Sequence, residues 1–232
     1  MIADVASFSG FRPQLLEFLS ELRANNSREW FQAHRAEYDE LLLEPSRMFV
    51  VAMGERLRTL GDDIHAEPKV HGSIFAINRD TRFSADKTPY KTHLDLWFWQ
   101  GDGPSRERPG YFLRLTGDRL LLGAGVHSFT DAAVERYRRA VLDDAEGNRL
   151  EQAAAAVGSE LVGGRTYKRV PAGLPADHSR ADWLRHSGLF AELEQAVPQE
   201  LFGEALPDWC LEHFERVAPL QRWLVDLLPS AD

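Results

Sequence analysis

Cysteine is nearly absent from this chain, and so are the long apolar runs that membrane-spanning segments need. Cys210 is the only cysteine among 232 residues, which excludes an intrachain disulfide and a zinc site built on several cysteines. No run of about 18 apolar residues occurs. Residues 1–4 lack the charged segment and the apolar stretch of a secretory signal. Together these features predict a cytoplasmic protein without a membrane span.

Positive charge is also scarce. The chain has 27 Lys and Arg residues against 36 Asp and Glu residues, a formal net charge of −9. Binding of a long nucleic acid needs clustered Lys and Arg to displace counterions, so extended nucleic acid is not an expected partner. Residues 78–93 are an exception, because they contain four basic residues and two acidic ones. A local positive excess in an acidic protein suits a small anionic ligand.

The composition is that of an ordinary soluble domain, with 44% hydrophobic and 27% charged residues. We expect a single α+β domain over 1–232, with a central antiparallel sheet flanked by N-terminal and C-terminal helices. The helical N-terminal part covers about 8–60, the sheet-rich centre about 64–126, and the helical C-terminal part about 130–228. No internal repeat or low-complexity tract divides the chain.

Apolar residues recur at helical spacing in the N-terminal part. This periodicity predicts helices over 11–24, 28 to about 43, and 46–60. Ser27 is a candidate N-cap for the second helix, and Pro45 suits the first turn of the third.

The pattern changes at residue 64 to short apolar runs separated by turns. Expected strands are 73–77, 94–99, 111–116 and 119–125, with a weaker edge candidate at 64–70 because it contains Pro68. Gly117-Asp118 joins two of them as a tight hairpin. Since no helix separates these strands, the sheet should be antiparallel.

Helices return in the C-terminal part. Thr130 is the expected N-cap of a helix over 130–142, followed by helical segments at 146–157, 181–186 and 189–196 and a last helix over 207–228 with a break at Pro219. A short strand is expected at 165–170, after Gly163-Gly164.

The densest polar segment lies between two of the expected strands. Residues 78–93 read N-R-D-T-R-F-S-A-D-K-T-P-Y-K-T-H. This segment, with the preceding G-S-I-F, resembles the signature of a widespread bacterial family of unknown function that also occurs in fungi. Further matches are N-N-x-x-x-W-F at 25–31, P-G-Y-F-L at 109–113, a glycine-bearing strand at 121–125 and K-R-x-P at 168–171. The resemblance covers roughly 8–225. It departs at Ala76, where a larger and often basic side chain is expected, and it implies no particular activity.

Anion-binding candidates are the basic side chains of this segment and of the later K-R-x-P. Arginine matches the planar geometry of carboxylate and phosphate groups, and lysine adds point charge. The candidates are Arg79, Arg82, Lys87, Lys91, Lys168 and Arg169. We expect Arg79, Arg82 and Lys91 to point into a shared concave pocket.

Candidate catalytic residues are Asp80, Tyr90 and His93, because a phenol or an imidazole can move protons and a carboxylate can orient either one. On a strand beginning near Tyr90, the side chains of Lys91, His93 and Asp95 would share one face. No metal site is predicted, since the histidines show no H-x-H or H-E-x-x-H spacing, and no cofactor is indicated. Gly123-Ala124-Gly125 is too short for a phosphate loop and instead indicates close backbone approach or a bulge.

Three functions are compatible with these observations. The first, which we favour, is an enzyme acting on a small phosphorylated or carboxylated substrate, with the basic cluster as an oxyanion clamp. The second is a non-catalytic module that binds a nucleotide or the end of a nucleic acid. The third is an interaction protein whose strand Trp97-Phe98-Trp99 meets a partner, with the charged residues of 78–93 forming only a structural ion-pair network.

Overall fold

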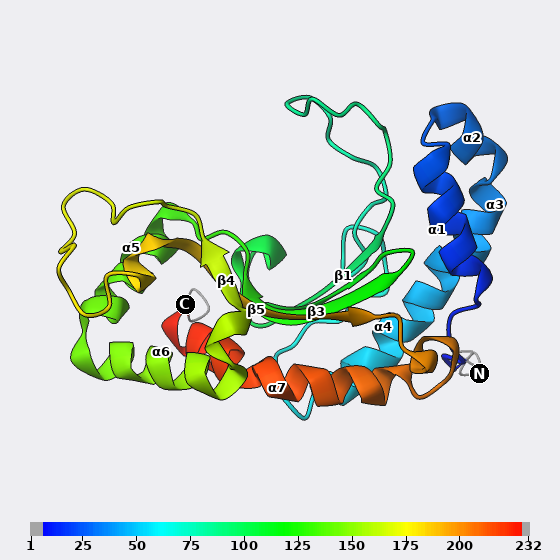
Figure 1. Cartoon of the computed structure of the whole chain (residues 1–232). Coiled ribbons are helices and arrows are strands. Elements are labelled where there is room, and N and C mark those ends of the chain that lie inside the picture. Colours follow the sequence, from blue (N-terminus) through cyan, green and yellow to red (C-terminus); the bar gives the residue numbers. More distant parts are fainter. Residues whose placement is uncertain (1–6, 229–232) are drawn as a thin grey trace.

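The computed structural model of the chain describes residues 7–228 and combines a curved sheet with helices (Figure 1). The sheet is antiparallel throughout and has the strand order β1-β2-β3-β5-β4, so the expected α+β class is confirmed. Its strands are β1 (Leu94–Trp99), β2 (Gly110–Leu115), β3 (Arg119–Val126), β4 (Val162–Arg165) and β5 (His186–Ala196).

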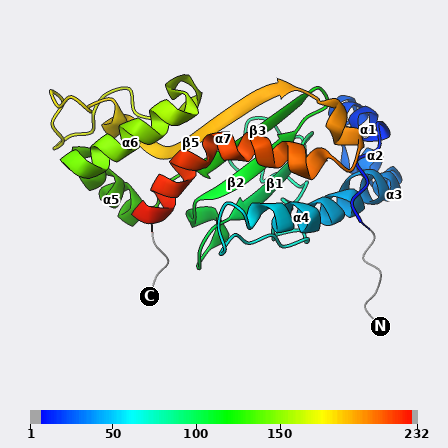
Figure 2. The same ribbon diagram turned by 90° about the horizontal axis from the view of Figure 1, so that it is seen from below.

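Helices cover only one face of the sheet. Helix α7 (Leu206–Leu227) and helix α4 (Glu44–Leu57) lie across its convex face, as Figure 2 shows. Tyr111 of β2 packs against Phe214 of α7 with 5.1 Å between ring centroids. Side chains of the strands that point this way are buried in one core with the helices, whereas no α-helix of residues 7–228 lies over the concave face (Figure 1).

The remaining helices stand at the two ends of the sheet. Helices α1 (Gln14–Ala24), α2 (Arg28–Ala33) and α3 (Arg35–Tyr38) lie at one end, and α5 (Asp131–Leu142) and α6 (Asp144–Val157) at the other (Figure 1). The expected caps form: the side chains of Ser27 and Thr130 accept hydrogen bonds from Trp30 N and Ala133 N, both at 3.2 Å. Each cap satisfies a backbone N–H that the first turn leaves free.

The helical segment expected at 28 to about 43 is divided, and the next helix continues directly from it. A π-helical segment, Asp39–Leu43, joins α3 to α4, so Pro45 produces no break. Proline is tolerated there because the first turn of α4 does not require its missing N–H. Pro219 likewise lies inside α7 without interrupting it.

The expectations for 189–196 and 165–170 are wrong. Residues 189–196 belong to the long strand β5, and the short strand is β4, earlier than expected. Leu189, Ala191 and Leu193 are buried while the residues between them are not, which is the two-residue period of a strand. Alanine, leucine and glutamate favour a helix locally, but pairing with β3 on one side and β4 on the other overrides that preference. At 181–186 only a 3₁₀ turn forms, Trp183–Arg185.

Residues 64–78 run beside β1 as an irregular edge rather than as regular strands. Ile74 forms a bridge with Leu96, Trp97 N donates to Ser73 O at 2.9 Å, and Phe75 N donates to Asp95 O at 3.1 Å. The expected strand at 73–77 is therefore present only as isolated pairing. This irregular segment therefore covers the outer edge of β1.

Within the described part of the chain, no helix is both long and apolar enough to cross a membrane.

Candidate functional site

The concave face of the sheet contains a cavity of about 530 Å³. Its floor is formed by side chains at alternate strand positions, because successive residues of a strand point to opposite faces. The opposite face is the one buried under α7. The residues that line the cavity are Phe75, Asp95, Leu96, Trp97, Arg106, Phe112, Leu113, Arg114, Leu121, Gly125, His127, Ser128, Phe190 and Glu192.

Aromatic rings form much of the cavity floor. Trp97 and Phe112 are register partners on β1 and β2, with ring centroids 6.5 Å apart and an interplanar angle of 23°. The planes of these two neighbouring rings are nearly parallel, and the rings offer a platform on which a flat ligand could stack. Phe190 adds a third ring, and His127 stacks on it at 5.5 Å.

Glycines let these rings lie close to the sheet. A Cβ atom at Gly123 would be 2.4 Å from Cζ of Phe112, one at Gly163 would be 2.5 Å from the ring of Phe190, and one at Gly110 would be 2.8 Å from the Trp97 ring. Such distances are too short for any real Cβ contact. The close backbone approach expected for the 123–125 glycines is thus present, and aromatic rings occupy the space.

Two cations flank Phe75 at one side of the cavity. The Nζ atom of Lys91 lies 4.9 Å from the Phe75 ring centroid, and Cζ of Arg106 lies 5.3 Å from it. These distances are typical of cation–π contacts. The neighbouring indole is fixed by a hydrogen bond of 2.9 Å from Trp97 Nε1 to the carbonyl oxygen of Ser105. Cationic groups therefore adjoin the aromatic platform.

Asp95 is shared by three basic side chains. Arg114 Nε, His93 Nε2 and Lys91 Nζ lie 2.6, 3.2 and 3.4 Å from its carboxylate oxygens. Burial alone would raise the pKa of Asp95, but hydrogen bonds from His93 and Arg114 outweigh burial and hold this pKa well below its ordinary value. The face-sharing expected for Lys91, His93 and Asp95 is present, and the carboxylate stays ionised.

The other carboxylate of the cavity, Glu192, has a different environment. Among the residues that the structure describes, no basic side chain forms an ion pair with it, and none forms one with Arg106. Both side chains line the cavity. In this site the charge of Asp95 is balanced by basic side chains, whereas Arg106 and Glu192 are free to contact a ligand.

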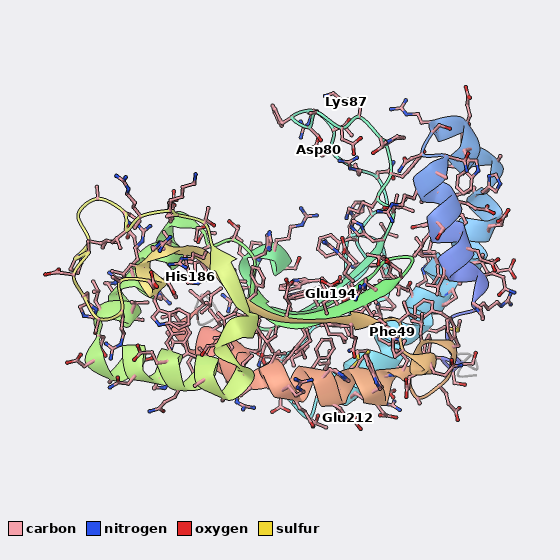
Figure 3. All side chains as sticks on the ribbon, in the orientation of Figure 1. Phe49, Asp80, Lys87, His186, Glu194 and Glu212 are labelled. Atoms are coloured by element: carbon pink, nitrogen blue, oxygen red, sulfur yellow. The ribbon has the colours of Figure 1, made fainter. Side chains whose placement is uncertain are left out.

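The segment 78–90, called the arm below, rises from the sheet with Asp80 and Lys87 near its end (Figure 3). Its two sides are paired at the base, where Lys91 N donates to Ile77 O at 2.7 Å and Arg79 N donates to Pro89 O at 2.9 Å. The base is anchored by Asn26, whose side chain bonds both the backbone N–H and the backbone C=O of Tyr90.

The charged groups of the arm are satisfied within the arm. Arg79 contacts Asp86 and Thr88, Arg82 pairs with Asp80 at 2.7 Å, and Lys87 Nζ donates to Thr81 O at 2.8 Å. The pKa of Asp86 is lowered to about 2 by the backbone N–H of Thr88, then by Arg79 and the Thr88 hydroxyl. Local pairing of this kind is what a structural network requires.

The structure does not bring Arg79, Arg82 and Lys91 to one pocket. Lys91 contacts Phe75 and Asp95, which line the cavity, whereas the two arginines are held by carboxylates two and seven residues away along the arm. The expected pocket needed all three to converge, and the arm's own acidic residues prevent it.

Tyr90, Lys168 and Arg169 also lie outside this cavity. The Tyr90 ring is buried and stacks on Phe31 with centroids 4.2 Å apart, so it packs the arm against α2. Lys168 and Arg169 are exposed in the loop that follows β4, at the end of the sheet away from the arm (Figure 1). Of the predicted residues, His93 and Lys91 remain beside the cavity. In residues 7–228, no cluster of three or more His, Cys, Asp or Glu side chains is suited to hold a metal ion.

Sequence reasoning missed most of the cavity lining. Phe112, Arg114, His127, Phe190 and Glu192 come from two strands and a loop far apart in the chain, and only the register of β2, β3 and β5 assembles them. One signal was present, since glycines recur on the strands next to those that carry the rings.

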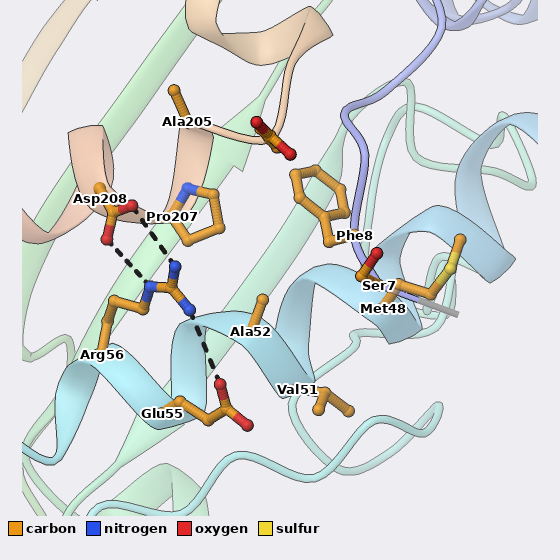
Figure 4. A pocket seen from close by; sticks show the side chains of 11 residues that line it. Ser7, Phe8, Met48, Val51, Ala52, Glu55, Arg56, Ala205, Pro207 and Asp208 are labelled. Atoms are coloured by element: carbon orange, nitrogen blue, oxygen red, sulfur yellow. Dashed lines mark hydrogen bonds and ion pairs between the residues drawn. The ribbon is translucent and has the colours of Figure 1, made fainter. Parts of the chain in front are cut away.

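A second hollow, of about 610 Å³, lies between α4 and the start of α7 (Figure 4). Its guanidinium, Arg56, already contacts Asp208 at 2.9 Å and Glu55 at 3.6 Å. With two carboxylates on one cation, it is less suited to an anion than the concave face.

A family model described as conserved hypothetical protein (DUF2461) matches residues 14–223. No curated protein and no solved structure matches the chain.

Proposed function

The chain belongs to DUF2461, a conserved family of unknown function. We propose that this protein binds a small anionic ligand that contains a flat ring. The ligand occupies the concave-face cavity, with its ring on Trp97 and Phe112 and its anionic group beside Arg106. The observation that supports this most is the pair of nearly parallel rings next to a cation without an ionic partner in the described chain.

Size and lining both suit such a ligand. A volume of about 530 Å³ falls within the range of roughly 300–1,000 Å³ typical of small-molecule sites. Stacking of a base on an aromatic side chain contributes about 1–3 kcal/mol of binding free energy. Arginine supplies the paired N–H donors that phosphate and carboxylate accept.

The ligand's charge must be met by Arg106 rather than by the cations around Asp95. Arg114, His93 and Lys91 already share one carboxylate. Arg106 contacts only the face of Phe75 among the interactions observed for it, so it can turn to an anion without leaving a buried carboxylate unpaired. This makes Arg106 the first cation to test.

Calorimetric titration with guanosine 5′-monophosphate (GMP) and with ribose 5-phosphate tests the proposal. GMP should bind more tightly than ribose 5-phosphate, because only GMP can stack. Trp97→Leu and Arg106→Gln should each weaken GMP binding by about tenfold or more. Arg119→Gln, which changes an exposed cation outside the cavity, serves as the control. Equal GMP affinity in the parent and both cavity variants would contradict the proposal.

A second candidate is catalysis on the bound ligand, and the contact of 3.2 Å between His93 Nε2 and Asp95 favours it. A carboxylate fixes the orientation of an imidazole and stabilises its protonated form, as general acid–base catalysis requires. If the protein is an enzyme of this kind, His93→Asn should leave the GMP affinity unchanged and abolish turnover. Conversion of GMP, followed by phosphorus NMR, is the measurement; a parent protein that leaves a panel of mononucleotides unchanged argues for binding alone.

The interaction-protein alternative has less support. It required an exposed, flat strand edge. Phe98 and Trp99 are buried, Trp99 stacks on His65 at 4.9 Å, and Trp97 lines the cavity.

A further inference from the structure

Glu192 stands out among the charged residues of the cavity. It lies on β5 between Ala191 and Leu193, both of which are buried on the opposite face. Its register partner on β3 is Gly123, which has no side chain to fill the adjoining space. In the described chain its carboxylate has no ionic partner, although it lines a cavity with an aromatic floor. A carboxylate in such a place lacks the compensation that partial burial usually requires.

The cavity has a polar direction. Trp97, Phe112, Gly123 and Glu192 form one row across β1, β2, β3 and β5. Neighbouring strands are about 4.8 Å apart, so this row spans roughly 14 Å. Trp97 Nε1 donates a hydrogen bond to the carbonyl oxygen of Ser105, the residue next to Arg106. A cation therefore adjoins one end of the ring platform and a carboxylate the other.

The ring of Phe112 reaches along this row toward the carboxylate. It covers Gly123, and Gly123 is paired directly with Glu192. A flat ligand stacked on Phe112 would thus present the edge of its ring to Glu192. Asp95, the other cavity carboxylate, cannot act in this way because three basic groups already occupy it.

We propose that Glu192 is a specificity residue that accepts hydrogen bonds from N–H groups on the ring edge of the ligand, opposite to its anionic group. This inference rests on the proposed function and narrows its ligand class. An ionised carboxylate accepts but never donates, and its two oxygens can take two parallel N–H groups. The class is an anionic heteroaromatic compound with adjacent N–H donors, of which the guanine ring is one form.

Two nucleotides that differ only at this edge test the inference. GMP has two N–H donors on its six-membered ring, whereas purine riboside 5′-monophosphate has the same ring system without them. We expect the parent to prefer GMP by about 10- to 100-fold, the range typical of hydrogen bonds to a charged group. Glu192→Gln should remove most of this preference and leave the affinity for purine riboside 5′-monophosphate nearly unchanged.

Glu194→Gln is the matched control. Glu194 lies two residues further on the same strand and face, but it pairs with Arg119 at 3.8 Å and does not line the cavity. The Glu194→Gln protein should keep the parent's preference for GMP over purine riboside 5′-monophosphate. If both nucleotides bind but the Glu192→Gln protein binds GMP as tightly as the parent does, Glu192 is not a specificity residue, and the concave-face cavity remains the proposed ligand site. If neither nucleotide binds at millimolar concentration, the proposed function fails with it.

Discussion

The ring of Phe112 lies directly on the backbone of Gly123, so that a Cβ atom at residue 123 would be 2.4 Å from the ring and 2.3 Å from the carbonyl oxygen of Ala191. One of these neighbours is a side-chain ring, and the other is the backbone of the paired strand. The ring could turn aside, but the strand could not without disturbing the sheet. Residue 123 therefore controls both the platform and the pairing of β3 with β5.

Gly123→Ala should lower the free energy of unfolding by about 1–3 kcal/mol, the usual cost of overpacking. Chemical denaturation followed by tryptophan fluorescence measures this change. Gly203→Ala is the control, because its nearest neighbour would be 4.0 Å away and its φ of −141° suits any residue. A stable Gly123→Ala protein that still binds GMP would show that the ring does not need to lie against the sheet.

Asp95→Asn should lower the free energy of unfolding by about 1–3 kcal/mol at pH 7, since three basic side chains lose the negative charge that they share. The pKa of Asp95 is held below its ordinary value, so the unfolded chain takes up this proton first as pH falls. The contribution of Asp95 is therefore complete above about pH 4 and is lost as pH falls toward its folded-state pKa.

The measurement is urea unfolding of parent and Asp95→Asn from pH 7 downward. The difference between them should shrink below about pH 4. Asp62→Asn, at an exposed position, is the control for a general change of charge. A difference that stays constant down to the acid end would exclude Asp95 as the source of the pH dependence.

Gly147→Ala in helix α6 should destabilise the protein even though alanine normally favours a helix by about 1 kcal/mol over glycine. The added Cβ would be 2.6 Å from the guanidinium of Arg180. Arg180 is buried and bonds Asn148 at 2.6 Å and Glu151 at 3.1 Å, so it has little freedom to withdraw.

The combination with Arg180→Ala separates the two effects. In that background the clash is absent, and Gly147→Ala should become neutral or stabilising. Melting temperatures of the four proteins give the coupling between the two sites. Equal effects of Gly147→Ala in both backgrounds would mean that the contact with Arg180 is not the cause.

Arg82→Ala at the arm should change neither stability nor GMP binding measurably. The Arg82 side chain is 77% exposed and forms its ion pair with Asp80, and an exposed pair contributes roughly 0–1 kcal/mol. Thermal melting with and without GMP measures both effects. If GMP no longer raised the melting temperature of the Arg82→Ala protein, the arm would have to take part in GMP binding.

Local signals predicted the hairpin and the starts of the helices capped by Ser27 and Thr130. The capping residues Ser27 and Thr130 act through their own first turns, and the turn at 116–119 depends only on neighbours. These features could be read from sequence because the interactions that form them span three or four residues. The strand β5 could not, since its partners lie more than 60 residues away along β3.

The candidate site was predicted in part for the same reason. Lys91, His93 and Asp95 were expected on one face, and strand alternation alone places them there. The carboxylates that hold Arg79 and Arg82 were equally visible in the sequence, but nothing in it indicated whether these arginines would pair locally or with a ligand. Phe190 and Glu192 reach the cavity only through the register of three strands.

The π-helical turn Asp39–Leu43 sets how the chain tolerates changes in length. Such a turn amounts to one residue inserted into an α-helix, and each residue of a helix turns the chain by about 100°. Deleting one residue there would make the helix regular and rotate Tyr38, which packs on Phe31, relative to Phe49 on α4. Homologues are therefore expected to keep the spacing between Tyr38 and Phe49 fixed.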